Sequence, residues 1–226
     1  MNIELHLFTN GILGLSTCEM IKTTYSSFCE IFNINIKPTV WFNPSWYGSN
    51  LYYSNLKKIF PVVNLTSSLS DGYISAIETS SSNFLFMLEH DWEFLPTITH
   101  SLTDICSLME NDNLMHLRFN KRANIPMMWD KSLHEVESDI KYCLSPSLSN
   151  NPHIIKKDLY MESAFPHIRR MSGSRGIEER LTVNSLFKGA IYGPLNYKQT
   201  IRHLDGRKWE KNFFLPYFHV GWANKK

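Results

Sequence analysis

The sequence predicts an α/β protein with a mainly parallel central sheet flanked by helices. In the N-terminal half, short apolar segments alternate with longer amphipathic ones, the order typical of parallel strand–helix–strand units. Residues 84–88 are apolar without interruption, as expected for a strand covered on both faces. A length of 226 residues fits one large domain of this class better than two independent ones.

The expected elements of the N-terminal half follow from periodicity and turn residues. A strand at 3–8 ends at the turn signal Thr9-Asn10-Gly11, and Ser16 or Thr17 is expected to cap a helix that runs to Phe32. Asp71-Gly72 opens a later helix. The remaining expected elements are a strand at 34–42, a helix at 51–60, a strand at 61–63, a helix at 69–81 and the strand at 84–88.

The C-terminal half is less regular. Strands are expected at 114–119 and 152–155, and a helix at 176–186, while the tail from Gly189 reads as a loop-rich region. No Pro-, Gly- or Ser-rich linker separates the halves, so we expect one domain, 1–226, made of two lobes at about 1–95 and 96–226.

Composition excludes several classes. The net charge of +2 is too small to indicate a nucleic-acid partner, and no apolar run reaches the ~20 residues that span a bilayer. The four cysteines lack C-x-x-C spacing, which favours buried free thiols in a reducing compartment. The N-terminus lacks a basic region, so we expect a cytoplasmic protein. Abundant Asn, Ile, Lys and Ser are typical of an AT-rich gene, such as a viral one. If the gene is viral, the expected location is the cytoplasm of the host cell.

The most informative motif is Glu89-His90-Asp91, directly after the apolar strand. Two carboxylates at the end of a buried strand stay ionised only if water or a cation compensates their charge. A hard divalent cation such as Mn²⁺ or Mg²⁺ provides that compensation, and it also neutralises a departing diphosphate. The plain alternative is an acidic turn that caps a helix.

Three further features stand in a consistent order around this motif. Asp71 opens the helix before the strand, Glu178 and Glu179 begin the helix expected at 176–186, and His203 lies near the C-terminus. Each has a structural alternative: a capping turn for Asp71, favourable helix-dipole placement for the two glutamates, and a surface turn at 203–207. Ligands of parallel sheets bind beyond the carboxyl ends of the strands, where Thr9-Asn10-Gly11 also lies.

The segments 84–94, 117–122, 149–153 and 203–207 resemble small stand-alone GT-A glycosyltransferases of large DNA viruses, phages and bacterial surface-polysaccharide clusters. The resemblance is carried by motifs only, although they are spread over most of the chain. It implies a metal-dependent transferase with a nucleoside-diphosphate sugar donor, for which UDP or GDP is expected, and a carbohydrate acceptor. The chain departs from the family's D-x-D pattern by having Glu89 in place of the first aspartate.

The resemblance also implies residue roles. Thr9, Asn10, Gly11, Asp71, Glu89, His90 and Asp91 would bind the nucleotide sugar, and Asp91, His203 and Glu89 would hold the metal. Glu178 or Glu179 would be the catalytic base of an inverting reaction, which we favour over retention. Candidates for phosphate or acceptor contacts are Arg118, Arg122, Arg169, Arg170 and Arg175, and those for a sugar platform are Trp92, Trp129 and Trp209.

Other functions remain open. A sugar nucleotidyltransferase would use a similar sheet and metal, but the loop after the first strand carries no basic residue, which disfavours it. A non-catalytic glycan-binding module would account for the aromatic residues and not for the paired acids. A metal-dependent hydrolase lacks an H-x-H or H-E-x-x-H motif here, and a DNA glucosyltransferase lacks a basic stripe.

Overall fold

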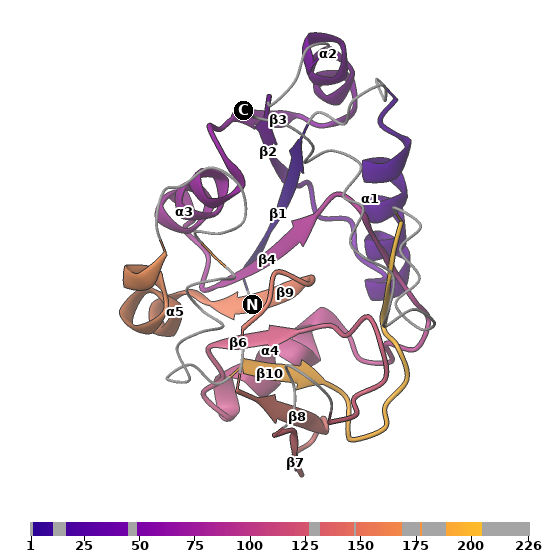
Figure 1. The fold of residues 1–226 in the computed structure, drawn as a ribbon, viewed down its shortest axis with the longest axis vertical. Coiled ribbons are helices and arrows are strands. Elements are labelled where there is room, and N and C mark those ends of the chain that lie inside the picture. Colours follow the sequence, from indigo (N-terminus) through magenta and orange to yellow (C-terminus); the bar gives the residue numbers. More distant parts are fainter. Residues whose placement is uncertain are drawn as a thin grey trace, which may run out of the picture.

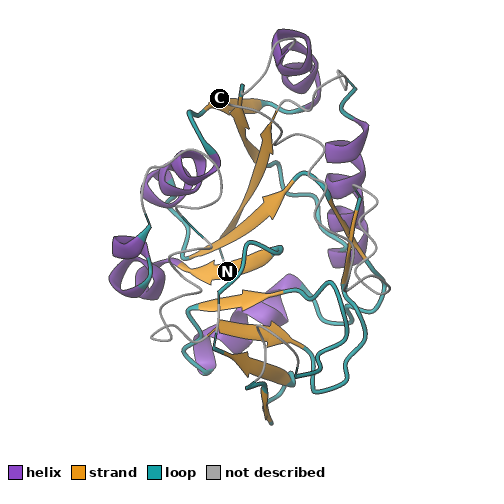
Figure 2. Ribbon diagram, viewed as in Figure 1, coloured by secondary structure: helices purple, strands orange, loops and turns teal. Residues whose placement is uncertain are grey.

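The computed structural model describes residues 2–10, 17–44, 49–126, 132–146, 148–168, 177 and 189–204. Figures 1 and 2 show one continuous sheet with helices on both faces, which confirms the predicted α/β class. The strands are β1 Ile3–Asn10, β2 Thr39–Asn43, β3 Val62–Leu65, β4 Phe84–Glu89, β5 Trp92–Phe94, β6 His116–Arg118, β7 His134–Val136, β8 Tyr142–Ser145, β9 His153–Lys156, β10 Gly189–Tyr192 and β11 Ile201–His203. The helices are α1 Glu19–Phe32, α2 Ser49–Ile59, α3 Leu69–Thr79, α4 Leu102–Asn111, α5 Lys157–Ser163 and the 3₁₀ turn η2 Phe165–His167.

The sheet has the strand order β3-β2-β1-β4-β9-β6-β10-β8-β7. Its first four strands are parallel, so their carboxyl ends form one edge. β9 runs antiparallel to β4 on one side and to β6 on the other, and β6 and β10 are again parallel. A separate two-stranded sheet of β5 and β11 lies directly after the carboxyl end of β4. The sheet therefore runs through both halves of the chain.

Side-chain alternation along β4 divides the core into two layers. Phe84, Phe86 and Leu88 pack in a cluster with residues of α1, α2 and α4, while Leu85 and Met87 pack in a cluster with residues of α3 and α5. β4 is thus covered on both faces, as its uninterrupted apolar sequence predicts. The phenylalanines of the first cluster stack edge to face; Phe28 and Phe86, for example, have ring centroids 4.9 Å apart.

Element boundaries differ from expectation in two informative places. α1 begins at Glu19, and its N-cap residue is Cys18 without a side-chain cap, so the expected cap at Ser16 or Thr17 is wrong. β2 begins only at Thr39, because Asn33 ends α1 in a left-handed conformation and residues 34–38 belong to no helix or strand. Within the described parts of the chain, no helix is long and apolar enough to cross a membrane.

Candidate active site

The turn after β4 is held by hydrogen bonds from two neighbouring elements. The backbone N–H of His90 donates to the carbonyl of Phe8 at the end of β1, at 2.9 Å. The hydroxyl of Thr24 in α1 donates to the carbonyl of His90, at 2.6 Å. Both backbone groups of His90 are therefore satisfied within the fold. The peptide that carries the predicted acidic motif has a fixed position before any ligand binds.

Asp91 and His203 lie together, although 111 residues of sequence separate them. Nε2 of His203 is 3.3 Å from Oδ2 of Asp91, and the two side chains are 4% and 16% exposed. The contact exists because β11 pairs with β5, and the N–H of Leu204 continues this ladder by donating to the carbonyl of Asp91 at 2.7 Å. The structure thus brings together two of the three predicted metal ligands.

The chemistry of this pair fits a divalent cation. A carboxylate oxygen and an imidazole nitrogen are both ligands that Mn²⁺ accepts. Two ligands on adjacent corners of a metal site, each about 2.1 Å from the ion, lie about 3 Å apart, close to the observed 3.3 Å between the Asp91 and His203 atoms. No group of three or more His, Cys, Asp or Glu suited to a metal occurs among the described residues.

Glu89, the third predicted ligand, does not join that pair in a three-residue group within the described structure. It is the last residue of β4 and is half-buried. Alternation along the strand directs it to the same face as Met87, toward the layer that contains α3. A role for Glu89 in contacting the metal or the donor stays a prediction.

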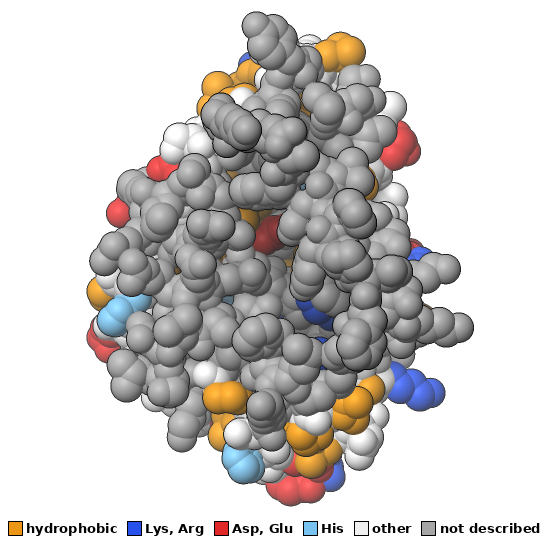
Figure 3. Space-filling view, in the orientation of Figure 1, with side chains coloured by type: hydrophobic (Ala, Val, Ile, Leu, Met, Phe, Trp, Pro, Cys, Tyr) orange, Lys and Arg blue, Asp and Glu red, His pale blue; other side chains and the backbone are white. Residues whose placement is uncertain are grey.

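The surface in Figure 3 shows an acidic side chain near the middle of this face, with basic side chains below it.

The end of β1 contributes one buried and one exposed candidate. The hydroxyl of Thr9 is 2.8 Å from that of Tyr52 in α2, and both residues are buried. Burial raises the pKa of Tyr52 to about 12, so this phenol stays neutral. Asn10 is exposed at the strand end, opposite Asn43 of β2. Asn10 is therefore better placed than Thr9 to contact a ligand, and Gly11 lies outside the described residues.

Asp71 supports the structure of α3. Ser68 is the N-cap residue, and its hydroxyl accepts a hydrogen bond from the N–H of Asp71 at 3.0 Å. The Asp71 carboxylate in turn accepts hydrogen bonds from the N–H and the hydroxyl of Ser67, at 3.0 and 3.2 Å. These contacts are those of a capping turn, the structural alternative considered above. Contact between Asp71 and a nucleotide remains a prediction.

The predicted catalytic pair, Glu178 and Glu179, lies outside the described residues, as do Arg169, Arg170, Arg175, Trp129 and Trp209. Ile177, immediately before the pair, is described. It is 2% exposed and belongs to the apolar cluster that contains Phe8 and Met87. The residue next to the glutamates is therefore packed on the α3 side of β1 and β4, the side toward which Glu89 is directed.

The remaining candidates divide by burial. Arg118 is only 6% exposed at the end of β6, where its Nη2 donates to the hydroxyl of Ser145 at 3.5 Å. Trp92 is 5% exposed and packs against the ring of His203. Trp92 is therefore not an open platform for a sugar, and contact of Arg118 with a phosphate or the acceptor stays a prediction. Arg122 is half-buried in the loop after β6, where Lys121 lies with its ammonium 5.9 Å from the centroid of the Trp92 ring. The motifs did not reveal the contacts that Lys121, Tyr52 and Thr24 make with Trp92, Thr9 and His90.

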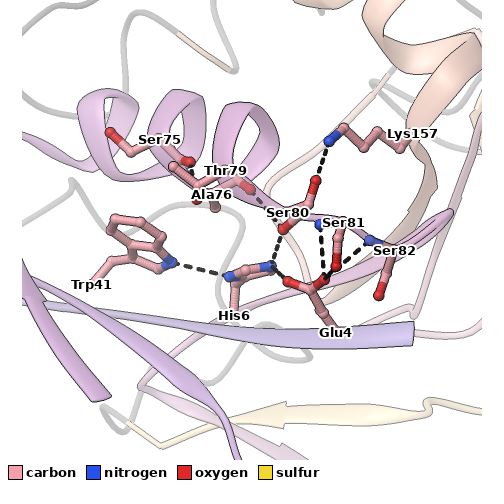
Figure 4. A network of polar contacts seen from close by, with 10 residues as sticks. All are labelled: Glu4, His6, Trp41, Ser75, Ala76, Thr79, Ser80, Ser81, Ser82 and Lys157. Carbon is pink, nitrogen blue, oxygen red and sulfur yellow. Dashed lines mark hydrogen bonds and ion pairs between the residues drawn. The ribbon is translucent and has the colours of Figure 1, made fainter. Parts of the chain in front are cut away.

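A second polar network lies at the opposite ends of the strands (Figure 4). Buried His6 is 2.8 Å from the Ser80 hydroxyl through Nε2 and 3.6 Å from the Glu4 carboxylate, which resembles a nucleophile–base–acid arrangement. However, the indole N–H of Trp41 donates to Nδ1 of His6 at 3.1 Å, so the imidazole proton must be on Nε2. Ser80 in turn donates to the carbonyl of Ala76. An imidazole in this tautomer cannot accept the serine proton, so the network is structural.

Comparison with known proteins gives structural matches and no sequence matches. No family model and no curated protein matches the sequence. A fragment of S. aureus TarS, residues 1–349, has a TM-score of 0.57 at 12% identity over 90% of this chain and 60% of its own length. GalNAc-T7 with UDP, GalNAc and Mn²⁺ gives 0.58 at 8% identity over 89% of this chain and 43% of its own. The inositol-1-phosphate CTP transferase of T. maritima gives 0.51 at 11% identity and covers 89% of both chains.

These matches bear on the fold. The chain spans about three fifths of the TarS fragment and less than half of GalNAc-T7, so it corresponds to part of those proteins. It corresponds to nearly the whole of the CTP transferase. The same architecture thus supports glycosyl transfer in some proteins and nucleotidyl transfer in another. The chain has a GT-A-like α/β fold, and the Asp91–His203 pair lies at the carboxyl edge of its sheet.

Proposed function

We propose that the protein is a metal-dependent glycosyltransferase that moves a sugar from a nucleoside-diphosphate donor to a carbohydrate acceptor. The observation that carries this proposal is the 3.3 Å approach of His203 to Asp91 at the end of β4. A surface turn at 203–207, the structural alternative, would not require a buried histidine directed at this carboxylate. UDP-sugars are the first donors to test, because the similar structures contain UDP-GlcNAc with TarS and UDP with GalNAc-T7.

In the proposed reaction an acceptor hydroxyl attacks the anomeric carbon of the donor. The new bond joins the hydroxyl oxygen to that carbon, and the bond from the carbon to the diphosphate breaks with its electron pair on the leaving diphosphate. A divalent cation held by Asp91 and His203 would supply positive charge for this leaving group. In an inverting reaction, Glu178 or Glu179 would take the proton of the attacking hydroxyl.

The donor site is tested by thermal unfolding with UDP, GDP, dTDP and CDP, each with and without Mn²⁺. We expect one nucleotide to raise the melting temperature in the presence of Mn²⁺, since a ligand that binds only the folded state stabilises it. The result also identifies the nucleotide. If none of the four stabilises the protein when Mn²⁺ is present, the donor-site proposal is wrong.

Asp91→Asn tests the metal site in the same assay. This variant keeps the side-chain shape and removes the charge, so we expect the Mn²⁺-dependent nucleotide shift to disappear and turnover to fall about a hundredfold or more. Asp139→Asn is the matched control, because Asp139 is an exposed aspartate in the loop between β7 and β8. The melting temperature of the metal-free protein should be similar for both variants. Equal nucleotide shifts in both would contradict the role of Asp91.

Sugar nucleotidyl transfer is the second candidate, because the T. maritima CTP transferase matches this chain over 89% of both lengths. The released product separates the two reactions. A glycosyltransferase consumes a nucleoside-diphosphate sugar and releases the nucleoside diphosphate, while a nucleotidyltransferase consumes a nucleoside triphosphate and a sugar phosphate and releases pyrophosphate. Glycan binding without release of either product would favour a non-catalytic binding module.

A further inference from the structure

Trp92 and His203 form a buried pair of rings beside Asp91. They are directly opposite each other in the antiparallel ladder of β5 and β11, so their side chains lie on the same face of the ribbon. Their ring centroids are 4.4 Å apart and their planes are inclined by 64°, an edge-to-face arrangement. The residues are 5% and 9% exposed. The indole therefore limits the orientations that the imidazole can adopt.

The ladder that carries these rings is itself anchored in the core. Phe94 of β5 packs edge to face with Phe28 and Phe32 of α1, at 5.7 and 5.6 Å between centroids. The backbone N–H of Phe94 donates to the hydroxyl of Ser27 in α1, at 3.1 Å. These contacts fix β5 against α1, and they therefore also fix the backbone position of Trp92 in the same strand.

A second contact strengthens the ladder at its exposed face. Arg202 of β11 lies opposite Glu93 of β5, and its Nε donates to the Glu93 carboxylate at 2.8 Å, with Nη2 contacting the same oxygen. This two-point contact is solvent-exposed on the arginine side. It holds β11 against β5 from the face opposite to Trp92 and His203.

We infer that Trp92 is a positioning residue for metal binding, which holds the His203 imidazole with Nε2 toward Asp91 before an ion arrives. This inference rests on the proposed metal site. An unsupported imidazole would distribute over three χ1 rotamers and two ring orientations, and only some of these states bring Nε2 to Asp91. Affinity falls as the fraction of competent states falls, and loss of a residue that orients a metal ligand typically costs about tenfold or more, so we expect removal of the indole to weaken metal binding about tenfold.

The test measures Mn²⁺ binding to the full chain without nucleotide, by the loss of the free-Mn²⁺ electron paramagnetic resonance signal. We expect Trp92→Leu to raise the Mn²⁺ dissociation constant about tenfold, and Trp92→Phe, which keeps a ring in contact with His203, to stay within about twofold of the parent. Trp41→Leu is the matched control, because Trp41 is a buried tryptophan that contacts a different histidine, His6. It should lower stability without changing Mn²⁺ affinity.

Arg202→Glu provides a second test that leaves the buried residues intact. Repulsion from Glu93 should loosen β11 and weaken Mn²⁺ binding about two- to fivefold, and Glu93→Arg in the same chain should restore it. If the melting curve without metal shows that Trp92→Leu does not fold, the Arg202→Glu experiment decides whether the β5–β11 ladder positions His203.

The outcomes separate the inference from the proposed function. If the parent protein binds no Mn²⁺ even with a nucleoside diphosphate, both are wrong. If the parent binds Mn²⁺ and His203→Ala weakens binding, but a folded Trp92→Leu or Arg202→Glu does not, the positioning role is wrong and the metal site stands. If His203→Ala has no effect, His203 is not a ligand, and the positioning role is wrong for that reason.

Discussion

At the scale of single residues, His6 shows how burial controls protonation in this fold. Its ring is 2% exposed, Trp41 donates to one ring nitrogen, and the other contacts Ser80. Burial lowers the pKa of His6 to about 4, against the smaller opposing effect of the Glu4 carboxylate. The neutral form is therefore built into the native state, because a protonated Nδ1 would face the Trp41 N–H as a second donor.

This protonation state predicts acid sensitivity. The unfolded chain binds a proton at His6 below about pH 6.5, whereas the native state binds it only near pH 4. The contribution of His6 to stability is therefore fully present above pH 6.5 and declines as the pH falls toward 4. We expect the titration of His6 to lower the free energy of unfolding by about 2 kcal/mol between pH 7.5 and pH 5.0, as measured by urea unfolding. His6→Gln should be less stable at pH 7.5 but lose less on acidification. An unchanged slope in this variant would show that other groups, such as buried His153, dominate.

Glu178 and Glu179 allow a second test at this scale. Only one carboxylate can take the acceptor proton, so Glu178→Gln and Glu179→Gln should differ in turnover, with the base variant reduced about a hundredfold or more. Donor affinity, measured by the UDP-induced melting shift, should change little in either. Two equal and mild effects would instead support helix-dipole placement as the reason for both glutamates.

The residue scale also shows what sequence reasoning can reach. Motif order predicts that Asp91 and His203 share a site, and the structure places them in contact. The role of Asp71 in capping was one of two predicted alternatives, and its contacts with Ser67 are now visible. Lys121 and Thr24 could not be selected, because their contacts with Trp92 and His90 depend on which strands and helices pack together, and no local pattern encodes that.

At the scale of elements, α4 depends on a reciprocal cap. The hydroxyl of Ser101 accepts from the N–H of Asp104, and the Asp104 carboxylate accepts from the N–H and hydroxyl of Ser101. These bonds lower the pKa of Asp104. The first four N–H groups of a helix have no helical partners, and this cap satisfies two of them, those of Ser101 and Asp104.

Ser101→Ala should therefore destabilise the protein by about 1 kcal/mol, measured by urea unfolding at neutral pH. Ser107→Ala is the control, because Ser107 is exposed in the interior of the same helix and alanine is a better helix former there. Its stability should be unchanged or slightly higher. If the two variants were equally stable, the cap would contribute nothing measurable.

Elements were predictable where the periodicity is strong. The continuous apolar run of β4 and the amphipathic pattern of α3 gave nearly the observed bounds. β5 and β11 are three-residue strands that exist only because they pair with each other across about a hundred residues, so neither has a signal of its own. Ile34 and Ile36 suggested a longer β2, but they pack on the core from an extended segment outside the ladder.

At the scale of the whole molecule, the core protects the thiols. All four cysteines are free, and Cys18, Cys106 and Cys143 are buried. Burial raises the pKa of Cys106 to about 12 and that of Cys143 to about 11, so both remain unreactive thiols at neutral pH. Free thiols match the sequence-based expectation.

The rate of reaction with a thiol reagent such as Ellman's reagent measures this protection. We expect at most one thiol, that of half-buried Cys29, to react quickly in the native protein, and four in urea. Cys29→Ser should remove the fast phase. Rapid reaction of two or more thiols under native conditions would mean that the core opens more readily than its packing indicates.

The place of β9 in the sheet also sets the order in which the molecule can assemble. β9 is fully buried between β4 and β6, both of which precede it in the chain. During synthesis, the facing edges of β4 and β6 are therefore made well before the strand that joins them. A nascent chain that ends before residue 153 presents two unpaired strand edges, which favours association with other chains or with chaperones until β9 is made. The short segment His153–Lys156 thus joins β4 to β6, and the sheet is complete only when β10, later in the chain, joins β6 to β8.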